Sequence, residues 1–589
     1  MSTLLLPPRL VHLDMADDCE RPDLVVPASV EIFEMGEAFN VPFVFATKSR
    51  VREIEFGWLF NQPGVVIPKS TIRFSMGTKF NHPIVFEDGC PNMTQLLLSG
   101  FFNQPGFQLP KGVLLFDMLA LTEPFEFLQP SSVITLYMSY NFNAPGFVVP
   151  RSVKILHLGE KFNQPLRLED GSQLEILKSP GEFNQPSFGR TTLHLPATVQ
   201  HLDFTGGRFD QPLSFADDSQ LNRFFMNNVF NQTNLVLPAS MIRFEMGDSF
   251  NHPIAFQRLT QLTHLTLGEV YNHDIVLPDT VTSFVMNDAF DHRLQLSSQL
   301  QVFGMSNSYD ADFIHLPHTL KVFIMGDRFS GKMTGLPAGV TTFMMGNAFN
   351  RPFSISQPSQ LRKFRMGPAF NCTNGIRQPN GPADIKRHLL NHWGSQEEVF
   401  HLPRSVEDCT LGASFNQPLV IPTDSKLETL VLGTEFNHPL HLPRDSKLHT
   451  LHMGIKFNQP FHLHAGLIQW TMSFFFDQPI RFPPGSSLTH LTLGYRYNRP
   501  LDIPVDSKLQ SLTLGERYNQ PNLFIPAKVQ TFIMGKNFNQ EVTFDTRCRL
   551  KSLTQSMKFH ANFIVPYEIS QNLYDPEFVG DLDDNDNEG

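Results

Sequence analysis

One motif recurs along nearly the whole chain, at a step of about 20 or 21 residues. The copy from Leu427 to Leu440 reads L-E-T-L-V-L-G-T-E-F-N-H-P-L, which reduces to L-x-x-L-x-L-G-x-x-F-N-x-P-L. Repetition at such a step is the sequence signature of a solenoid, in which each repeat forms one coil that packs on its neighbours. The chain has 589 residues, and a repeat array of this length grows by adding coils.

The residues before the glycine of each copy predict a strand. In Leu512–Gly515 and Phe532–Gly535 large apolar residues alternate with others, which is typical of a strand with one buried face. The aromatic residue that follows the glycine is expected to turn back into the core. Burying it contributes about 4–6 kcal/mol as an upper bound, whereas ordering one coil costs on the order of 20–40 kcal/mol. One coil therefore cannot be stable alone, and the coils must stack.

An asparagine follows the aromatic residue in most copies, and an aspartate such as Asp210 or Asp477 replaces it in several others. A side-chain amide at a chain reversal can bond the backbone of its own coil and of the next one. We therefore predict a structural ladder that satisfies backbone groups along the array. The predicted ladder consists of Asn40, Asn61, Asn81, Asn103, Asn143, Asn163, Asn184, Asn231, Asn251, Asn272, Asn350, Asn371, Asn416, Asn437, Asn458, Asn498, Asn519 and Asn539.

Prolines exclude helices from the second half of most copies. A proline often stands three residues after the aromatic, and another follows shortly after it, which leaves no room for a helix. The segments between them, such as Leu419–Ile421, are rich in residues that favour extended backbone. The sequence therefore predicts an all-β solenoid of about 26 coils of about 20–22 residues. We expect a parallel β-sheet on one face, extended segments and turns on the other, and little helix.

The regularity of the motif predicts five segments. They are a capping coil at 1–25, repeats at 26–371, an insertion with a short helix or degenerate coil at 372–400, repeats at 401–565, and a C-terminal segment at 566–589 with a disordered acidic tail. Cys19 takes the place of the aromatic in the capping coil. In the insertion, His388 and His392 have a metal-compatible spacing, but no neighbouring ligand completes a site, so we expect them to be surface or packing residues.

Composition narrows the functional classes. The net charge is −11, which argues against a nucleic-acid partner, because phosphate contacts need clustered Lys and Arg. The five cysteines are scattered without a C-x-x-C pair, so neither a disulfide framework nor a thiolate zinc site is expected.

We expect no secretory signal in residues 1–8, and no apolar run is long enough to cross a membrane. We expect a monomeric, soluble, cytoplasmic protein without metal or cofactor. No catalytic motif stands out from the repeat, and we expect no enzyme activity.

One column of the repeat varies freely. It lies five residues before each aromatic, at the predicted outward position of the strand, and it holds nearly every class of residue. The column is either a solvated sheet face or a protein-binding strip with an acidic N-terminal third and an apolar middle near Val285–Met344. The candidate strip consists of Glu34, Glu55, Asp117, Tyr137, His157, Glu245, Thr266, Val285, Ile324, Met344 and Arg365.

The repeat resembles the FNIP repeat, a family known mainly from social amoebae and from large DNA viruses of protists. The resemblance rests on L-x-L-G-x-x-F-N-x-P-L, as at 156–166 and 430–440, and it covers nearly the whole chain. It implies a leucine-rich-repeat-like solenoid used for protein binding. Some viral members carry an N-terminal F-box and would act as substrate receptors of ubiquitin ligases. The coils of this chain begin within about the first twenty residues, so we expect no such domain here.

These observations predict a non-enzymatic repeat scaffold that binds a protein partner, of unknown identity, through the β face of a solenoid. Two alternatives stay open. The first alternative is a structural or assembly component that associates with itself in a viral or cytoskeletal setting. The second is a substrate-recognition subunit that acts with a separate F-box-type adaptor.

Overall fold

The computed structural model describes residues 6–7, 9–15, 24–118, 121–127, 129–372, 399–556, 558–560 and 563–564. The chain divides into two compact units, Met1–Thr282 with Met286–Gln295 (unit 1) and Ser283–Val285 with Leu296–Gly589 (unit 2). Cys19, the predicted helix of the insertion and the acidic tail lie outside the described residues.

The main sheet of unit 1 is parallel, and each coil contributes one short strand to it. The strands, in the order in which they pair, are β1 (His12–Met15), β3 (Ile32–Met35), β5 (Glu53–Glu55), β7 (Arg73–Ser75), β9 (Gln95–Leu97), β11 (Leu115–Asp117), β13 (Thr135–Tyr137), β15 (Ile155–His157), β17 (Ile176–Lys178), β19 (His201–Asp203), β21 (Arg223–Phe225), β22 (Arg243–Glu245) and β23 (His264–Thr266). Equivalent residues of successive coils are register partners, as Phe33 is of Ile54. Both of these side chains are buried, so the centre of each strand faces the core and its flanking residues face outward.

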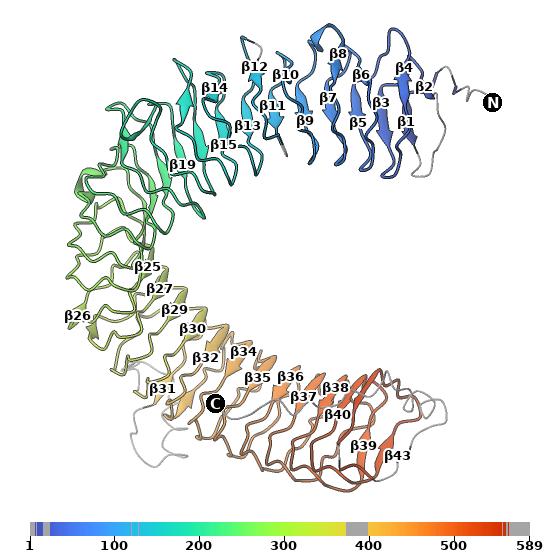
Figure 1. Ribbon diagram of the computed structural model, residues 1–589. Coiled ribbons are helices and arrows are strands. Elements are labelled where there is room, and N and C mark those ends of the chain that lie inside the picture. Colours follow the sequence, from blue (N-terminus) through green and yellow to red (C-terminus); the bar gives the residue numbers. More distant parts are fainter. Residues whose placement is uncertain are drawn as a thin grey trace. The chain divides into compact units, whose positions relative to one another are not determined.

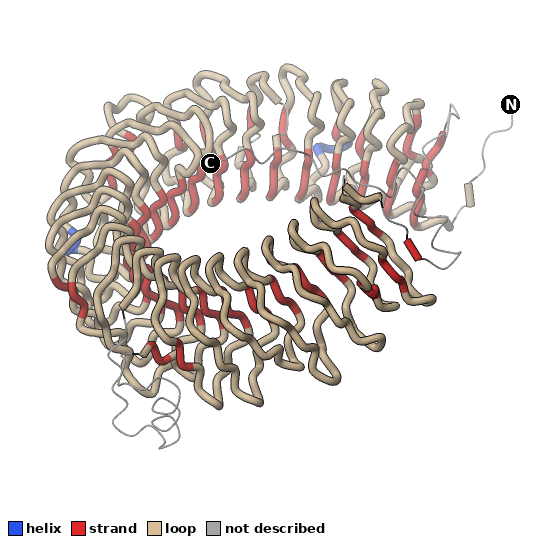
Figure 2. Tube along the Cα trace, turned by 90° about the horizontal axis from the view of Figure 1, so that it is seen from below, coloured by secondary structure: helices blue, strands red, loops and turns tan. Residues whose placement is uncertain are grey.

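Unit 1 carries a second set of short strands on the other side of its coils (Figure 1). These are β2 (Leu24–Val26), β4 (Phe43–Phe45), β6 (Val66–Ile67), β8 (Val85–Phe86), β10 (Gln108–Leu109), β12 (Glu126–Phe127), β14 (Val148–Val149), β16 (Arg167–Leu168), β18 (Leu193–Leu195) and β20 (Leu213–Phe215). They pair two at a time, β2 with β4, β6 with β8, β10 with β12, β14 with β16, and β18 with β20. The only helical turns among the described residues are the 3-10 turns η1 (Glu87–Gly89) and η2 (Phe256–Arg258), which Figure 2 shows among strands and loops.

Unit 2 repeats this plan. Its main sheet pairs in the order β24 (Ser283–Val285), β25 (Val302–Gly304), β27 (Val322–Ile324), β29 (Thr342–Met344), β30 (Lys363–Arg365), β32 (Asp408–Thr410), β34 (Thr429–Val431), β35 (Thr450–His452), β36 (Gln469–Thr471), β37 (His490–Thr492), β38 (Ser511–Thr513), β40 (Thr531–Ile533) and β42 (Ser552–Thr554). Its second strands are β26 (Phe313–Ile314), β28 (Lys332–Met333), β31 (Phe400–His401), β33 (Leu419–Val420), β39 (Leu523–Ile525), β41 (Val542–Phe544) and β43 (Phe563–Ile564). Here β26 pairs with β28 and β31 with β33, whereas β39, β41 and β43 form one three-stranded sheet. The predicted fold class, a parallel β-solenoid with little helix, is confirmed.

The stack of unit 2 continues directly across the predicted insertion. β30 pairs with β32 without a strand between them, although their sequence positions are far apart. The rings of Phe370 and Phe415 stack with centroids 6.3 Å apart, as in neighbouring coils. β30 and β32 are therefore direct neighbours in the main sheet.

Within each unit the coils diverge away from the main sheet. Hydrogen-bonded strands lie about 4.8 Å apart, whereas the centroids of equivalent buried rings are 5.9 Å apart for Phe60 and Phe80 and 6.2 Å apart for Phe415 and Phe436. Because these are equivalent residues of successive coils, the distances measure how far one coil is displaced from the next at that depth. Each unit therefore curves with its main sheet on the inner side.

Candidate functional site

The face of the main sheet that points away from the core, called the β face here, carries two rows of side chains. The first and third residues of each three-residue strand point outward, and the third-position row contains every residue of the predicted binding strip. In unit 1 it holds Glu34, Glu55, Asp117, Tyr137, His157, Glu245 and Thr266, and in unit 2 it holds Val285, Ile324, Met344 and Arg365. The structure thus provides two separate segments of the strip, one on each unit.

The N-terminal part of the unit 1 segment is acidic. Asp14, Glu34 and Glu55 are successive register partners in one row. Like charges directly opposite one another in a sheet are destabilising. Among the described residues, His12 Nε2 lies 3.2 Å from Oε2 of Glu34.

The central part of the unit 1 segment is a tightly packed group of polar and aromatic side chains. The rings of Tyr137 and His157 are 4.4 Å apart between centroids. Burial lowers the pKa of His157, and the neighbouring Lys178 ammonium lowers it further. Lys178 is itself 3.9 Å from the carboxylate of Asp203. The charges of Lys178 and Asp203 thus lie close to each other, and the lowered pKa favours the neutral imidazole of His157.

The C-terminal part of the unit 1 segment is also internally paired. The Nε of Arg243 donates to Glu245 Oε1 at 2.8 Å, and its guanidinium lies 5.3 Å from the centre of the Phe225 ring. Thr266 lies next to Glu245 in the row and is half-buried. The charged groups of Arg243 and Glu245 are therefore paired with each other within the protein.

The unit 2 segment is apolar. Its row runs Val285, Gly304, Ile324, Met344, Arg365, and the Ile324 side chain is 43% exposed. Gly304 has no side chain, and the Val285 methyl groups fill the space above it, since a Cβ at Gly304 would lie 3.1 Å from Val285 Cγ1. The row therefore lacks a side chain at Gly304, between Val285 and Ile324.

Two further valines enlarge this apolar surface. Val302 and Val322 are half-buried at the first position of β25 and β27, beside the third-position row. The sequence prediction followed the third-position column alone and missed them, although apolar residues at both positions of V-F-G and V-F-I are a visible signal. We call Val285, Val302, Val322, Ile324 and Met344 the apolar patch. Lys363 and Arg365, both exposed, border it on the C-terminal side.

The asparagines form hydrogen bonds that run from coil to coil. Asn40 Oδ1 accepts the backbone N–H of Asn61, and Asn61 Oδ1 accepts that of Asn81, both at 2.9 Å. The same bond recurs across the insertion, where Asn371 Oδ1 accepts the N–H of Asn416 at 2.9 Å. Every other asparagine of the predicted ladder makes it too, at 2.8 to 3.1 Å: Asn81, Asn103, Asn143, Asn163, Asn184, Asn231, Asn251, Asn272, Asn350, Asn416, Asn437, Asn458, Asn498, Asn519 and Asn539.

In many coils the residue after the asparagine adds a second bond between coils. Gln62 donates its side-chain amide to the main-chain oxygen of Asn40 at 3.0 Å. Where histidine replaces glutamine, as at His438, Nε2 lies 3.1 Å from the main-chain oxygen of Asn416. Glutamine and histidine alternate at this position because both can place a donor nitrogen there. These polar groups are therefore engaged in holding the coils together.

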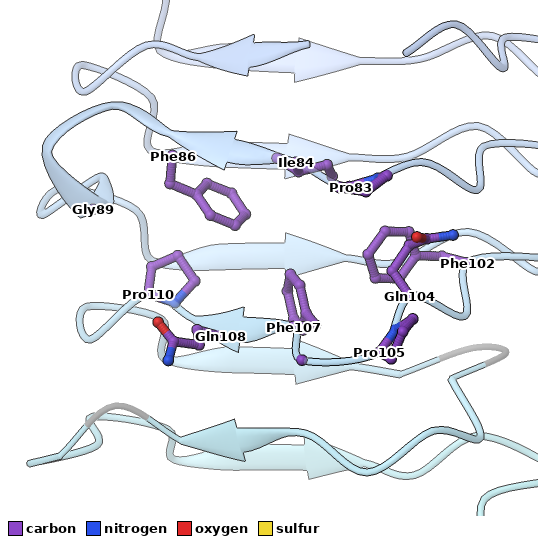
Figure 3. A pocket seen from close by; sticks show the side chains of 11 residues that line it. Pro83, Ile84, Phe86, Gly89, Phe102, Gln104, Pro105, Phe107, Gln108 and Pro110 are labelled. Carbon is purple, nitrogen blue, oxygen red and sulfur yellow. The ribbon is translucent and has the colours of Figure 1, made fainter. Parts of the chain in front are cut away.

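Several depressions lie on the opposite side of the coils, and two of them lie between second strands that do not pair. One of about 300 Å³ lies between β8 and β10, which do not pair, and is lined by Phe86, Phe107 and Pro110 among others (Figure 3). A similar one lies between β4 and β6. Hollows recur along the coils, and their lining mixes apolar rings with polar side chains, such as Gln104 and Gln108 in the first of them and His315 and Thr334 in another.

Neither a metal centre nor a membrane-spanning helix is found in the part of the chain that the structure describes. No group of three or more His, Cys, Asp or Glu side chains there could hold a metal ion. No helix among the same residues has the length and apolar character to cross a membrane.

Comparison with known proteins finds likeness to leucine-rich-repeat structures. CroV588, described as a novel circular leucine-rich-repeat protein, is 20% identical with a TM-score of 0.42, covering 96% of this chain and 93% of its own. YopM from Yersinia enterocolitica is 13% identical with a TM-score of 0.41, covering 79% of this chain and 90% of its own. No family model and no curated protein matches the chain. The resemblance to the FNIP repeat therefore stays a prediction.

Proposed function

We propose that this protein is a non-enzymatic scaffold that binds another protein through the β face of its solenoid, with the apolar patch of unit 2 as the contact surface. The observation that carries the proposal is the exposure of Ile324 among Val302, Val322 and Met344 on a sheet face. Contiguous exposed apolar side chains on a soluble surface typically mark an interaction site. The basic border at Lys363 and Arg365 would add long-range attraction to an acidic rim on the partner.

Binding rather than catalysis is supported by how the polar residues are used. The ladder asparagines and the glutamines or histidines beside them bond the backbone of neighbouring coils. A residue type that performs the same structural task in coil after coil is poorly suited to a unique catalytic role. The free thiols of Cys90, Cys409 and Cys548 are buried, which fits a reducing, intracellular location.

A paired substitution tests the proposal. Ile324→Glu with Met344→Glu places two carboxylates on the apolar patch, and we expect the loss of partner proteins captured from the native source, quantified by mass spectrometry against wild type. The matched control is Phe313→Glu, because Phe313 lies in β26 on the opposite side of the coils and is 54% exposed. An unchanged set of partners for the double variant, with the fold intact by circular dichroism, would exclude the apolar patch as the binding surface.

A further inference from the structure

A cation–aromatic patch lies at the edge of the coils in the C-terminal half of unit 2. It is formed by the two residues that precede the buried ring of each coil, and it comprises Phe474, Phe475, Tyr495, Arg496 and Arg517. The rings of Phe474 and Tyr495 stack with centroids 4.4 Å apart and an interplanar angle of 4°. The Arg496 guanidinium lies 4.5 Å from the centre of the Phe475 ring, and that of Arg517 lies 5.6 Å from the Tyr495 ring.

The backbone fixes this arrangement. The N–H of Arg496 donates to the carbonyl of Phe474 at 3.0 Å, and the N–H of Arg517 donates to that of Tyr495 at the same distance. Each coil is thereby held in register with the next, so side chains at equivalent positions must lie one above another. Most other coils of unit 2 carry small or polar residues at these two positions, such as Ala413 and Ser414, whereas the coil directly before the patch carries Ile455, which is exposed.

The charge of the patch is not neutralised by its neighbours. On the flanking coils, Lys456 pairs with Glu435 at 2.7 Å and Lys536 lies 3.7 Å from Glu516. Among the described residues, Arg496 and Arg517 make no ion pair, and both are exposed. The chain as a whole has a net charge of −11, whereas these two exposed guanidinium groups lie over the half-buried rings of Phe475 and Tyr495, next to the exposed ring of Phe474. Such groups bind carboxylates and aromatic side chains together.

The chain itself contains a segment of matching chemistry. Residues 575–589 read D-P-E-F-V-G-D-L-D-D-N-D-N-E-G, in which acidic side chains surround a phenylalanine and a leucine. The last described residue, Ile564, is eleven positions before this segment, a length of chain that reaches about 36 Å when extended. The coils between Tyr518 and Phe559 are displaced by only 5.9 and 6.1 Å at each step. The segment can therefore reach the patch from the end of the array.

We propose that the acidic C-terminal segment, residues 575–589, docks on the cation–aromatic patch of its own chain. Its carboxylates pair with Arg496 and Arg517, and Phe578 packs beside the exposed ring of Phe474. This inference is independent of the proposed protein-binding role of the apolar patch.

Zero-length carbodiimide coupling on the full-length protein tests the docking, because it joins a carboxylate only to an amine that it touches. We expect cross-links within a monomer from 575–589 to Lys456 and Lys536, mapped by mass spectrometry, and at least a fivefold loss of them in the R496E/R517E variant. R328E is the matched control, since Arg328 occupies the equivalent position in a coil without aromatic neighbours there. The conservative variant R496K/R517K should keep most of the yield.

Three outcomes would overturn the proposal. Cross-links from the segment that spread equally to lysines of unit 1, such as Lys79, would show that it has no preferred site. Cross-links to Lys456 and Lys536 that persist in R496E/R517E would show that the two arginines do not hold it. Cross-links found only between two chains would assign the patch to a second copy.

Discussion

Gly433→Ala is expected to be among the most damaging single-methyl changes in the protein. A Cβ at residue 433 would lie 1.8 Å from the carbonyl oxygen of Gly412 and 2.8 Å from its carbonyl carbon, in the preceding coil. Both obstacles are backbone atoms, so no side chain can move aside. The two coils would have to separate by more than about 1 Å to restore a normal contact, which is overpacking of the costliest kind.

The magnitude follows from the contacts that this separation disturbs. Overpacking itself costs about 1–3 kcal/mol, and the neighbouring bond from Glu435 N–H to the Ala413 carbonyl, 2.8 Å long, contributes about 0.5–1.5 kcal/mol. We therefore expect about 3 kcal/mol of local destabilisation, which corresponds to roughly a hundredfold increase in the opening equilibrium. In a repeat array the effect should concentrate in the coils that touch the mutation.

Hydrogen exchange measured by mass spectrometry is the appropriate assay, because it resolves individual coils. We expect faster exchange over residues 412–436 and little change in unit 1. Gly100→Ala is the control, since its Cβ would lie 3.6 Å from Thr78 Cγ2, an ordinary contact. Equal exchange in Gly433→Ala and in wild type would refute the close approach of these coils.

Three further predictions test other parts of the account. Asn437→Ala leaves the N–H of Asn458 without its 2.9 Å partner and should cost about 1 kcal/mol in chemical unfolding, whereas Asn437→Asp, which can still accept, should cost less. The pKa of His157 is lowered by burial and by the Lys178 ammonium, so the unfolded chain binds this proton more readily than the folded one. Stability should therefore be lost as the pH falls below about 6.5, and His157→Gln should weaken that dependence in unfolding curves recorded from pH 5 to 8. Burial raises the pKa of Cys90 to about 12 and that of Cys548 to about 11, so neither thiol should react with iodoacetamide at pH 8 until the protein unfolds, as read by peptide mapping.

The sequence specified the coil because each of its constraints is local. The apolar residues around Thr513 alternate with the period of a strand, Pro439 excludes a helix, and the ring of Phe436 needs a buried site that only a neighbouring coil can supply. These constraints agree with one another in most copies, so together they predict one structure for the coil. These local constraints also account for the main sheet, to which each coil contributes one strand and in which all strands are parallel.

The pairing of the second strands and the close approach of glycines depend on distances between coils. The sequence of a single repeat does not determine these distances. Most second strands pair two at a time, whereas β39, β41 and β43 form one sheet, and nothing in the sequence of β4 or β6 indicates that these two strands do not pair with each other. The close approach of Gly433 to Gly412 is likewise a property of the stack, because the two glycines belong to different coils.

The candidate site was predictable in position but not in composition. The third-position column located Ile324 and Met344 correctly on the β face, because strand alternation fixes which residues point outward. Val302 and Val322 join them only through the register between β25 and β27. The pairing of Arg243 with Glu245 and with the Phe225 ring depends on rotamers that no periodicity encodes.

The most direct test of the binding surface is site-specific photo-cross-linking in the native source. Ile324 on the β face and Phe313 on the opposite side are replaced, one at a time, by a photoreactive benzoylphenylalanine, and the adducts are identified by mass spectrometry. The account predicts a defined protein adduct from position 324 and none of that protein from position 313. The same adduct from position 313, with nothing from position 324, would contradict it.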